Sequence, residues 1–174
     1  MFTRVNILNI VRDHFNTLKR LNPKNDRIYW KDFLLFIFFP VCIGILLTLQ
    51  GVSIKTYIGN LIAAIAIFGG FLFNLLAIIY SQIDKIKTDA NQENSTIKKR
   101  FVKEIHINIS YSIVLSLIII MCLLVCTFKI PGFQYDFIVK KVFIGFTYFL
   151  LINFILTLLM VLNRVYILLK KDSE

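Results

Sequence analysis

Two histidines and three cysteines are the residues of this chain best suited to catalysis or metal binding. They are His14, His106, Cys42, Cys122 and Cys126. The sequence has no glycine-rich phosphate loop, no His-Glu-x-x-His pair, no Cys-x-x-Cys pair and no Gly-x-Ser-x-Gly nucleophile elbow. A metal site or a catalytic triad therefore has too few ligands and bases. We expect no metal, no cofactor and no enzymatic activity.

One spacing is nevertheless suggestive, because His106 follows Arg100 by six residues. It resembles the loose Arg-x5-His motif of the HEPN ribonucleases, in which an arginine and a histidine act on RNA in a helical dimer. Six residues turn a helix by about 240°, so these two side chains do not share a face. We therefore do not expect a ribonuclease, and we expect no direct nucleic-acid binding.

The composition explains why catalytic residues are scarce. Of the 174 residues, 57% are hydrophobic and only 17% are charged, and the mean hydropathy is +0.74. A soluble domain is typically about 25% charged. The charges are also grouped between long uncharged segments, which excludes a soluble or disordered protein and indicates an integral membrane protein.

Four uncharged segments have about the length that crosses a bilayer as a helix, roughly 20 residues. They are residues 33–51, 58–80, 107–128 and 142–162. Backbone amides in lipid must be paired within their own segment, which favours helices, and none of these segments alternates like a barrel strand. The sequence predicts an all-α membrane protein in which residues 1–174 form a single four-helix domain.

Lysines and arginines are unequally divided between the two sides of these segments. Sixteen of the twenty lie in residues 1–32, 81–106 and 163–174. Basic residues are retained on the cytoplasmic side, so both termini and residues 81–106 are predicted to be cytoplasmic. The net charge of +10 is interpreted mainly as this topology signal and as contact with anionic lipid. Arg164, near the inner end of the last segment, is predicted to reach lipid phosphate.

Two segments outside the predicted spans have helical periodicity. Within residues 1–32, apolar side chains recur at steps of three and four and predict an amphipathic helix: Leu8, Val11, Phe15 and Leu18. This helix either lies on the inner leaflet or packs against the bundle. Residues 81–106 are predicted to continue the second and third spans as a cytosolic helical hairpin with a polar break at 91–96.

The predicted hairpin carries a cluster of basic residues. They are Lys98, Lys99, Arg100 and Lys103. One interpretation is a solvated surface of mixed charge, since acidic residues lie nearby. The other is a docking site for a cytosolic partner protein.

Small and polar residues form stripes along three of the predicted spans. In the second span they define a small-residue seam: Gly59, Ala63, Ala66, Gly70, Asn74 and Ala77. Such residues allow helices to approach closely in lipid, which predicts packing within the bundle or against a second copy in a homo-oligomer. Polar residues of the third and fourth spans either pack in the same way or line a pore: Ser112, Ser116, Asn153 and Thr157.

These observations support two functions. The first is a non-enzymatic homo-oligomeric scaffold or sensor that presents a basic cytosolic face to a partner protein. The alternative is a pore-forming effector or small channel that permeabilises the membrane. The absence of charged residues from the middle of the spans argues against ion-coupled transport.

In length, number of spans and inside-facing termini, the chain resembles small four-helix membrane subunits of bacterial antiphage-defence systems, such as the Kiwa membrane subunit. The resemblance implies a multi-pass protein of the bacterial inner membrane. It further implies a sensor that recruits a cytosolic effector.

Overall fold

The computed structural model describes residues 7–18, 34–52, 54–88, 92–127 and 137–173. Helices make up nearly all of these ranges, and no strand occurs within them. The regular α-helices are α1 (Ile7–Thr17), α3 (Phe39–Leu49), α4 (Ile58–Thr88), α5 (Gln92–Thr127) and α6 (Phe137–Ser173). A π-helical turn, η1 (Leu34–Phe38), precedes α3, and a 3₁₀ turn, η2 (Ile54–Tyr57), precedes α4.

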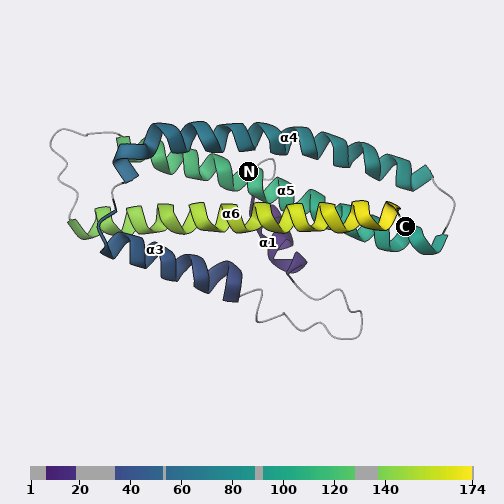
Figure 1. Cartoon of the computed structure of the whole chain (residues 1–174), viewed down its shortest axis with the longest axis horizontal. Helices are drawn as coiled ribbons and strands as arrows, with labels where there is room; N and C mark the ends of the chain where they lie inside the picture. Colours follow the sequence, from purple (N-terminus) through teal and green to yellow (C-terminus); the bar gives the residue numbers. More distant parts are fainter. Residues whose placement is uncertain (1–6, 19–33, 53, 89–91, 128–136, 174) are drawn as a thin grey trace, which may run out of the picture.

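Three helices, α4, α5 and α6, run along the long axis of the molecule (Figure 1). Three helical segments are long and apolar enough to cross a membrane: Ile54–Ser81, which joins η2 to most of α4, Lys99–Thr127 in α5 and Ile138–Leu168 in α6. The chain is therefore an all-helical, multi-pass membrane protein, as predicted. The Leu34–Leu49 segment is also apolar and helical but shorter, so a fourth span at 33–51 stays a prediction.

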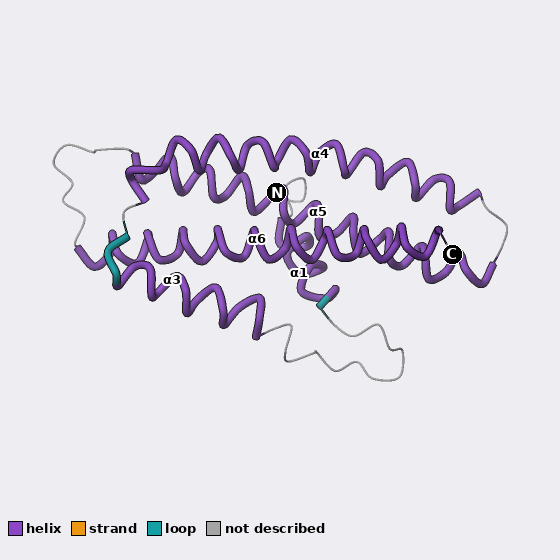
Figure 2. The backbone as a smooth tube through the Cα atoms, viewed as in Figure 1, coloured by secondary structure: helices purple, strands orange, loops and turns teal. Residues whose placement is uncertain are grey.

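Helix α5 occupies the centre of the bundle. Its side chains Ile105, Ile109, Ile119 and Leu123 are fully buried. Helices α4 and α6 both pack against it, while α3 packs against α6 (Figure 2). The third predicted span is thus the one most enclosed by protein, and α4 leaves much more of its surface exposed.

The first apolar helix is irregular at its start because of Pro40. A proline has no N–H, so it cannot donate a hydrogen bond to the carbonyl four residues earlier, which is that of Phe36. That carbonyl instead accepts a hydrogen bond from Asn153 Nδ2 of α6 at 2.8 Å. Pro40 thus leaves a carbonyl of η1 without its helical donor, and α6 supplies another donor.

Helix α3 ends at a glycine that adopts the left-handed conformation. Gly51 has φ +68°, which glycine adopts without steric cost. The N–H of Val52 donates to Leu47 O and that of Gly51 donates to Thr48 O, each at 3.3 Å. This is a Schellman end, and Tyr148 Oη of α6 donates to Val52 O at 3.1 Å just beyond it.

Helices α3 and α6 approach each other closely. A Cβ atom added to Gly44 would meet Gly145 O at 3.0 Å, and one added to Gly145 would meet Thr48 Oγ1 at 3.0 Å. Two glycines therefore bring these backbones together. Such close approach is the usual source of packing contacts between helices in lipid.

The small-residue seam does not pack inside this chain. All six of its residues are exposed along α4, and an added Cβ at Gly59 or Gly70 would meet nothing within 4 Å. The face of α4 that packs on α5 instead carries large side chains at steps of seven: Ile58, Ile65, Leu72 and Ile79. The interpretation of the seam as packing within the bundle is therefore wrong, and packing against a second copy stays a prediction.

The helical hairpin predicted over residues 81–106 is more regular than the sequence suggests. Helix α4 continues to Thr88 and α5 begins at Gln92. The predicted polar break at 91–96 is wrong over residues 92–96, which form the first turns of α5; residue 91 lies outside the described residues. The end of α4, the start of α5 and the end of α6 lie at the same end of the molecule (Figure 1).

Helix α1 lies against α5, near the middle of the long axis (Figure 1). Its buried residues are His14, Thr17 and Leu18, whereas Leu8 of the predicted apolar stripe is 79% exposed. The side that faces the bundle thus carries polar groups. They find partners on α5 and α6.

Candidate functional site

The candidate site is a layer of buried polar side chains where α1 meets the bundle. We define this polar layer as His14, Thr17, Glu104, Asn108, Tyr111, Asn153 and Arg164. Three of its members follow one another along α5 at steps of four and three, and so share one face. All but Arg164 are at most 8% exposed, and the side chain of Arg164 is 15% exposed.

His14 sits at the centre of the layer and is completely buried. Its Nδ1 lies 2.9 Å from Asn108 Oδ1. An amide oxygen only accepts hydrogen bonds, so Nδ1 carries the proton and the neutral ring leaves Nε2 bare. The ring stacks on Tyr111 with centroids 3.8 Å apart and planes 6° apart. Helix α5 therefore fixes the imidazole at one edge through a hydrogen bond and on one face through an aromatic contact.

Thr17 contributes a second link between α1 and α5. Its Oγ1 lies 2.7 Å from His14 O and 2.9 Å from Asn108 Oδ1. The single hydroxyl hydrogen serves one of these acceptors at a time. Asn108 Oδ1 thus lies within hydrogen-bond distance of two residues of α1, His14 and Thr17, and this fixes the position of α1 on α5.

An ion pair closes the layer. Arg164 Nη1 of α6 donates to Glu104 Oε2 of α5 at 2.5 Å, and Arg164 Nη2 donates to Thr17 O at 3.0 Å. Thr17 is the last residue of α1, where carbonyls lack partners within the helix and attract cations. The arginine therefore joins three helices. The prediction that Arg164 reaches lipid phosphate is wrong, because Glu104 and this helix end bind it instead.

The layer also reaches α3 through a chain of hydrogen bonds. Tyr111 Oη donates to Asn153 Oδ1 at 3.0 Å, and the amide nitrogen of Asn153 donates to the Phe36 carbonyl freed by Pro40. The ring of Phe36 lies edge-on to that of His14. The positions of α1, η1, α5 and α6 are thus linked by direct contacts.

His14 is held in its neutral form. Burial lowers its pKa from 6.5 to about 4; the hydrogen bond with Asn108 opposes this shift and the positive charge of Arg164 adds to it. A protonated ring would also place an N–H at Nε2, which has no hydrogen-bond partner within the described chain. The docked position of α1 therefore favours neutral imidazole.

The arrangement holds α1, α5 and α6 in fixed positions relative to one another. The nitrogen and oxygen atoms of the layer are mostly paired with one another, and no group of three or more His, Cys, Asp or Glu residues in the described ranges is placed to hold a metal ion. Arg100 Nε donates to Glu104 Oε1 at 3.3 Å, so this arginine belongs to the ion-pair network. His106 is half-buried.

The four candidate pore residues are all buried within a single chain. Ser112 and Thr157 are 0% exposed, and Ser116 and Asn153 are 3% exposed. The three hydroxyls each donate to a carbonyl of their own helix, those of Asn108, Ile113 and Asn153. None of these side chains faces a surface that a second copy can reach, which argues against a lumen formed by them around an oligomer axis.

The basic docking candidates lie at the start of the apolar part of α5. Lys99, Arg100 and Lys103 are exposed, and the side chain of Arg100 is 51% exposed although it pairs with Glu104. The side chain of Lys98 lies outside the described residues. The structure thus presents at least Lys99 and Lys103 on the surface beside α1.

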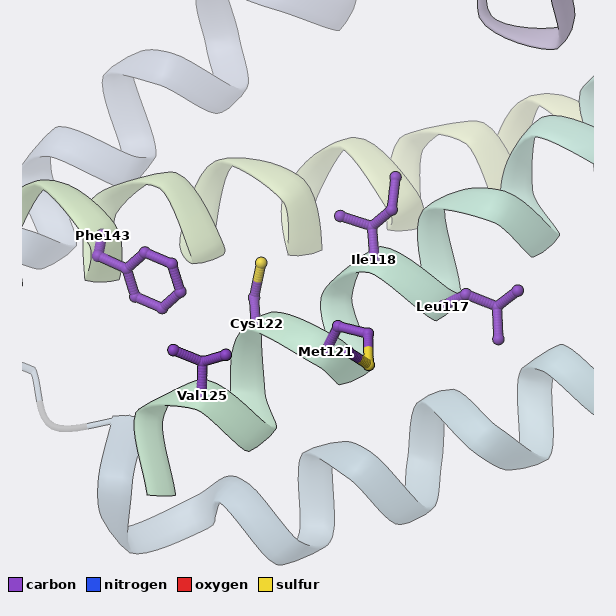
Figure 3. A pocket seen from close by; sticks show the side chains of 6 residues that line it. All are labelled: Leu117, Ile118, Met121, Cys122, Val125 and Phe143. Carbon is purple, nitrogen blue, oxygen red and sulfur yellow. The ribbon is translucent and has the colours of Figure 1, made fainter. Parts of the chain in front are cut away.

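The surface of the described bundle carries an apolar pocket and a polar one. An apolar one of about 290 Å³ opens between α5 and α6, as Figure 3 shows; it is lined by Leu117, Ile118, Met121, Cys122, Val125 and Phe143. Its residues belong to predicted spans, so lipid chains would fill it. A second pocket of about 280 Å³ lies between α1 and α5 and is lined by charged and polar residues.

Sequence reasoning did not identify His14, Thr17, Glu104, Tyr111 and Arg164 as members of a site. Two signals were present. Asn153, Thr157, Val161 and Arg164 continue one stripe at steps of four, four and three, and Pro40 requires a donor for Phe36 O. No pattern in the sequence indicates that α1 contacts α5, because 94 residues separate His14 from Asn108.

Likeness to known proteins gives no further indication of the activity. Comparison of the chain with protein-family models, curated proteins and solved structures finds no match. The function must therefore be argued from the geometry described above.

Proposed function

We propose that this chain is a non-enzymatic scaffold or sensor subunit of the bacterial inner membrane that presents a basic cytosolic surface to a partner protein. The observation that carries the proposal is the placement of exposed Lys99 and Lys103 on α5. This part of α5 is packed against α1 and tied to α6 through Glu104. The charges therefore stand on a rigid support, as suits a docking surface.

The proposal includes four spans with both termini in the cytoplasm. The Leu34–Leu49 segment would form the first span, shorter than the others and supported along α6 by the Gly44–Gly145 contact. The distribution of basic residues then places the α4–α5 connection and the end of α6 inside. A tag at residue 92 that reacts only from outside the cell would contradict this orientation.

We also propose that the protein forms a homo-oligomer through the small-residue seam. The seam is exposed along α4, and its glycines leave open space where a second helix can approach. Asn74 belongs to the same face, and an amide in lipid gains from a hydrogen-bonded partner on a neighbouring helix. A copy of the same seam would supply one.

The resemblance to antiphage-defence membrane subunits suggests what the partner does. A membrane sensor of that kind recruits a cytosolic effector, and a basic surface suits an acidic patch on such a protein. Electrostatic docking speeds encounter and fixes orientation. The interaction is therefore expected to weaken as salt is raised.

Charge reversal tests the docking surface. Lys98→Glu/Lys99→Glu should remove the partner that co-purifies with the tagged wild-type protein, as quantified by mass spectrometry. The control is Lys55→Glu/Lys140→Glu, which reverses two lysines on the side predicted to be outside and should retain the partner. Membrane insertion and oligomer size should be unchanged in both. Equal recovery of every co-purifying protein from the two variants would refute the proposal.

The alternative, a pore-forming effector, has less support because its candidate lining residues are buried and hydrogen-bonded. Purified protein in liposomes provides the direct comparison. The scaffold predicts no solute flux above empty liposomes. Flux from the protein alone that is lost in Ser116→Phe and kept in Lys98→Glu/Lys99→Glu would favour the pore.

A further inference from the structure

The pocket between α1 and α5 carries charges of both signs. It has a volume of about 280 Å³ and is lined by Asp13, Asn16, Thr17, Arg100, Lys103, Glu104 and Ile107. We infer that this pocket binds the zwitterionic headgroup of a phosphatidylethanolamine, with the lipid ammonium at Asp13 and the lipid phosphate at Lys103. The inference goes beyond the docking proposal and does not depend on a partner protein.

The pairing of charges inside the pocket is incomplete. Glu104 is neutralised by Arg164 and Arg100 through hydrogen bonds at 2.5 Å and 3.3 Å. Asp13 and Lys103 are exposed and form no ion pair within the described chain. Asp13 and Lys103 thus line the same pocket with opposite charges. The carboxylate oxygens of Asp13 and the ammonium nitrogen of Lys103 are more than 4.0 Å apart. A ligand that carries both an anion and a cation would satisfy them together.

The pocket lies at the depth expected of lipid headgroups. Ile107, at its wall, is the first residue of the third predicted span, and the charged residues of the pocket on α5 all precede it. Helix α1 forms the other wall and exposes apolar Ile7 and Leu8, as helices at a membrane interface do. A lipid could therefore place its headgroup in the pocket while its acyl chains follow the apolar surface.

The chemistry of the walls favours ethanolamine over other headgroups. A primary ammonium donates charge-assisted hydrogen bonds to a carboxylate, and such bonds are about twice as strong as neutral ones. The quaternary ammonium of choline has no N–H to donate. An anionic glycerol headgroup could place its phosphate at Lys103 but has no cation to offset the carboxylate of Asp13.

Native mass spectrometry of the purified full-length protein tests the inference. The probes are phosphatidylethanolamine, phosphatidylglycerol and phosphatidylcholine with identical acyl chains, added in equal amounts. The wild type should retain phosphatidylethanolamine preferentially. Asp13→Asn should lower that retention by about tenfold, the effect of one lost charge-assisted hydrogen bond, while retention of phosphatidylglycerol stays or rises.

Lys103→Gln should reduce the retention of all three lipids, because each carries a phosphate that this side chain would contact. The matched control is Lys99→Gln, an exposed lysine four residues earlier that does not line the pocket. It should leave lipid retention at the wild-type level. This design also separates the pocket from the docking surface, since the docking test changes only Lys98 and Lys99.

Three results would overturn the inference. One is equal retention of the three lipids by the wild-type protein. Another is unchanged lipid selectivity in both Asp13→Asn and Lys103→Gln, with helix content also unchanged by circular dichroism. The third is complete displacement of the lipid by an equal concentration of glycerophosphoethanolamine, which would identify a site for a soluble zwitterion instead.

Discussion

The small-residue seam of α4 and the polar layer differ in what surrounds them, although both follow helical spacing. The seam is exposed along its whole length, whereas the polar layer is almost completely buried and its side chains bind one another across three helices. Small residues permit another helix to approach but do not require it. Buried polar groups require partners, because an unpaired one loses its hydration without compensation.

The difference indicates which contacts hold the chain together and which remain available. The polar layer and the Gly44–Gly145 contact complete the bundle from within. The seam packs against no other described helix of this chain, and we therefore propose that it packs against a second copy. Substitutions in the layer should therefore destabilise the monomer, and substitutions in the seam should affect assembly alone.

The largest effect is expected from Arg164→Gln. This change leaves the carboxylate of Glu104 buried without its main partner and removes the donor to Thr17 O, so the free energy of unfolding should fall by about 3 kcal/mol. Arg100→Gln is the matched control, because that arginine pairs with the same carboxylate but its side chain is 51% exposed. It should cost less than about 1 kcal/mol.

Denaturant titration in mixed micelles, followed by circular dichroism, measures both losses. A loss in Arg164→Gln no larger than that in Arg100→Gln would show that the ion pair does not hold the helices. That result would also contradict the claim that the polar layer stabilises the monomer more than the seam does.

Acidification should weaken the docking of α1. The folded protein lowers the pKa of His14 from 6.5 to about 4, so the unfolded chain binds a proton more readily between these values. The stability that neutral His14 contributes is therefore complete above pH 6.5 and decreases as the pH falls toward 4. At pH 5 the loss should be about 2 kcal/mol.

Unfolding at pH 7 and pH 5 tests this dependence. His14→Gln should be less stable at pH 7 but should show a smaller decrease between the two pH values. The same decrease in the wild type and in His14→Gln would assign the pH dependence to other groups.

Alanine substitution of glycines should distinguish the α3–α6 contact from the seam. Gly44→Ala places a methyl group 3.0 Å from Gly145 O, so it should destabilise the protein by about 1–2 kcal/mol. Gly70→Ala meets nothing within 4 Å and should be neutral or stabilise the monomer by up to about 1 kcal/mol, as expected for alanine in a helix. Thermal unfolding in detergent measures the change in stability of both variants. If Gly70→Ala destabilises a monomeric sample, the seam is not exposed as described.

Much of the fold could be predicted because lipid imposes strong constraints. Long uncharged segments must be helical, and α4, α5 and α6 each contain such a segment. The predicted polar break is wrong over residues 92–96, because Gln92 and the polar residues after it begin α5. Polar side chains at a helix start can replace missing intrahelical partners and so do not by themselves indicate a loop.

The polar layer was harder to predict because its contacts are distant in sequence. Periodicity identifies a face of a helix but does not say which neighbour that face meets. The sequence indicates no partner for His14, and only the fold brings it to Asn108 and Tyr111. Likewise Arg164 near the end of a span is equally compatible with lipid phosphate, and the position of Glu104 on α5 decides between the two.

Disulfide cross-linking in native membranes tests the division between layer and seam most directly. In a background without native cysteines, Ala66→Cys and Ala63→Cys place thiols on the seam, and Phe68→Cys places one on another exposed side of α4. We predict that Ala66→Cys and Ala63→Cys both form covalent dimers under mild oxidation and that Phe68→Cys forms few dimers. Equal cross-linking at all three positions, or cross-linking at Phe68→Cys alone, would contradict it.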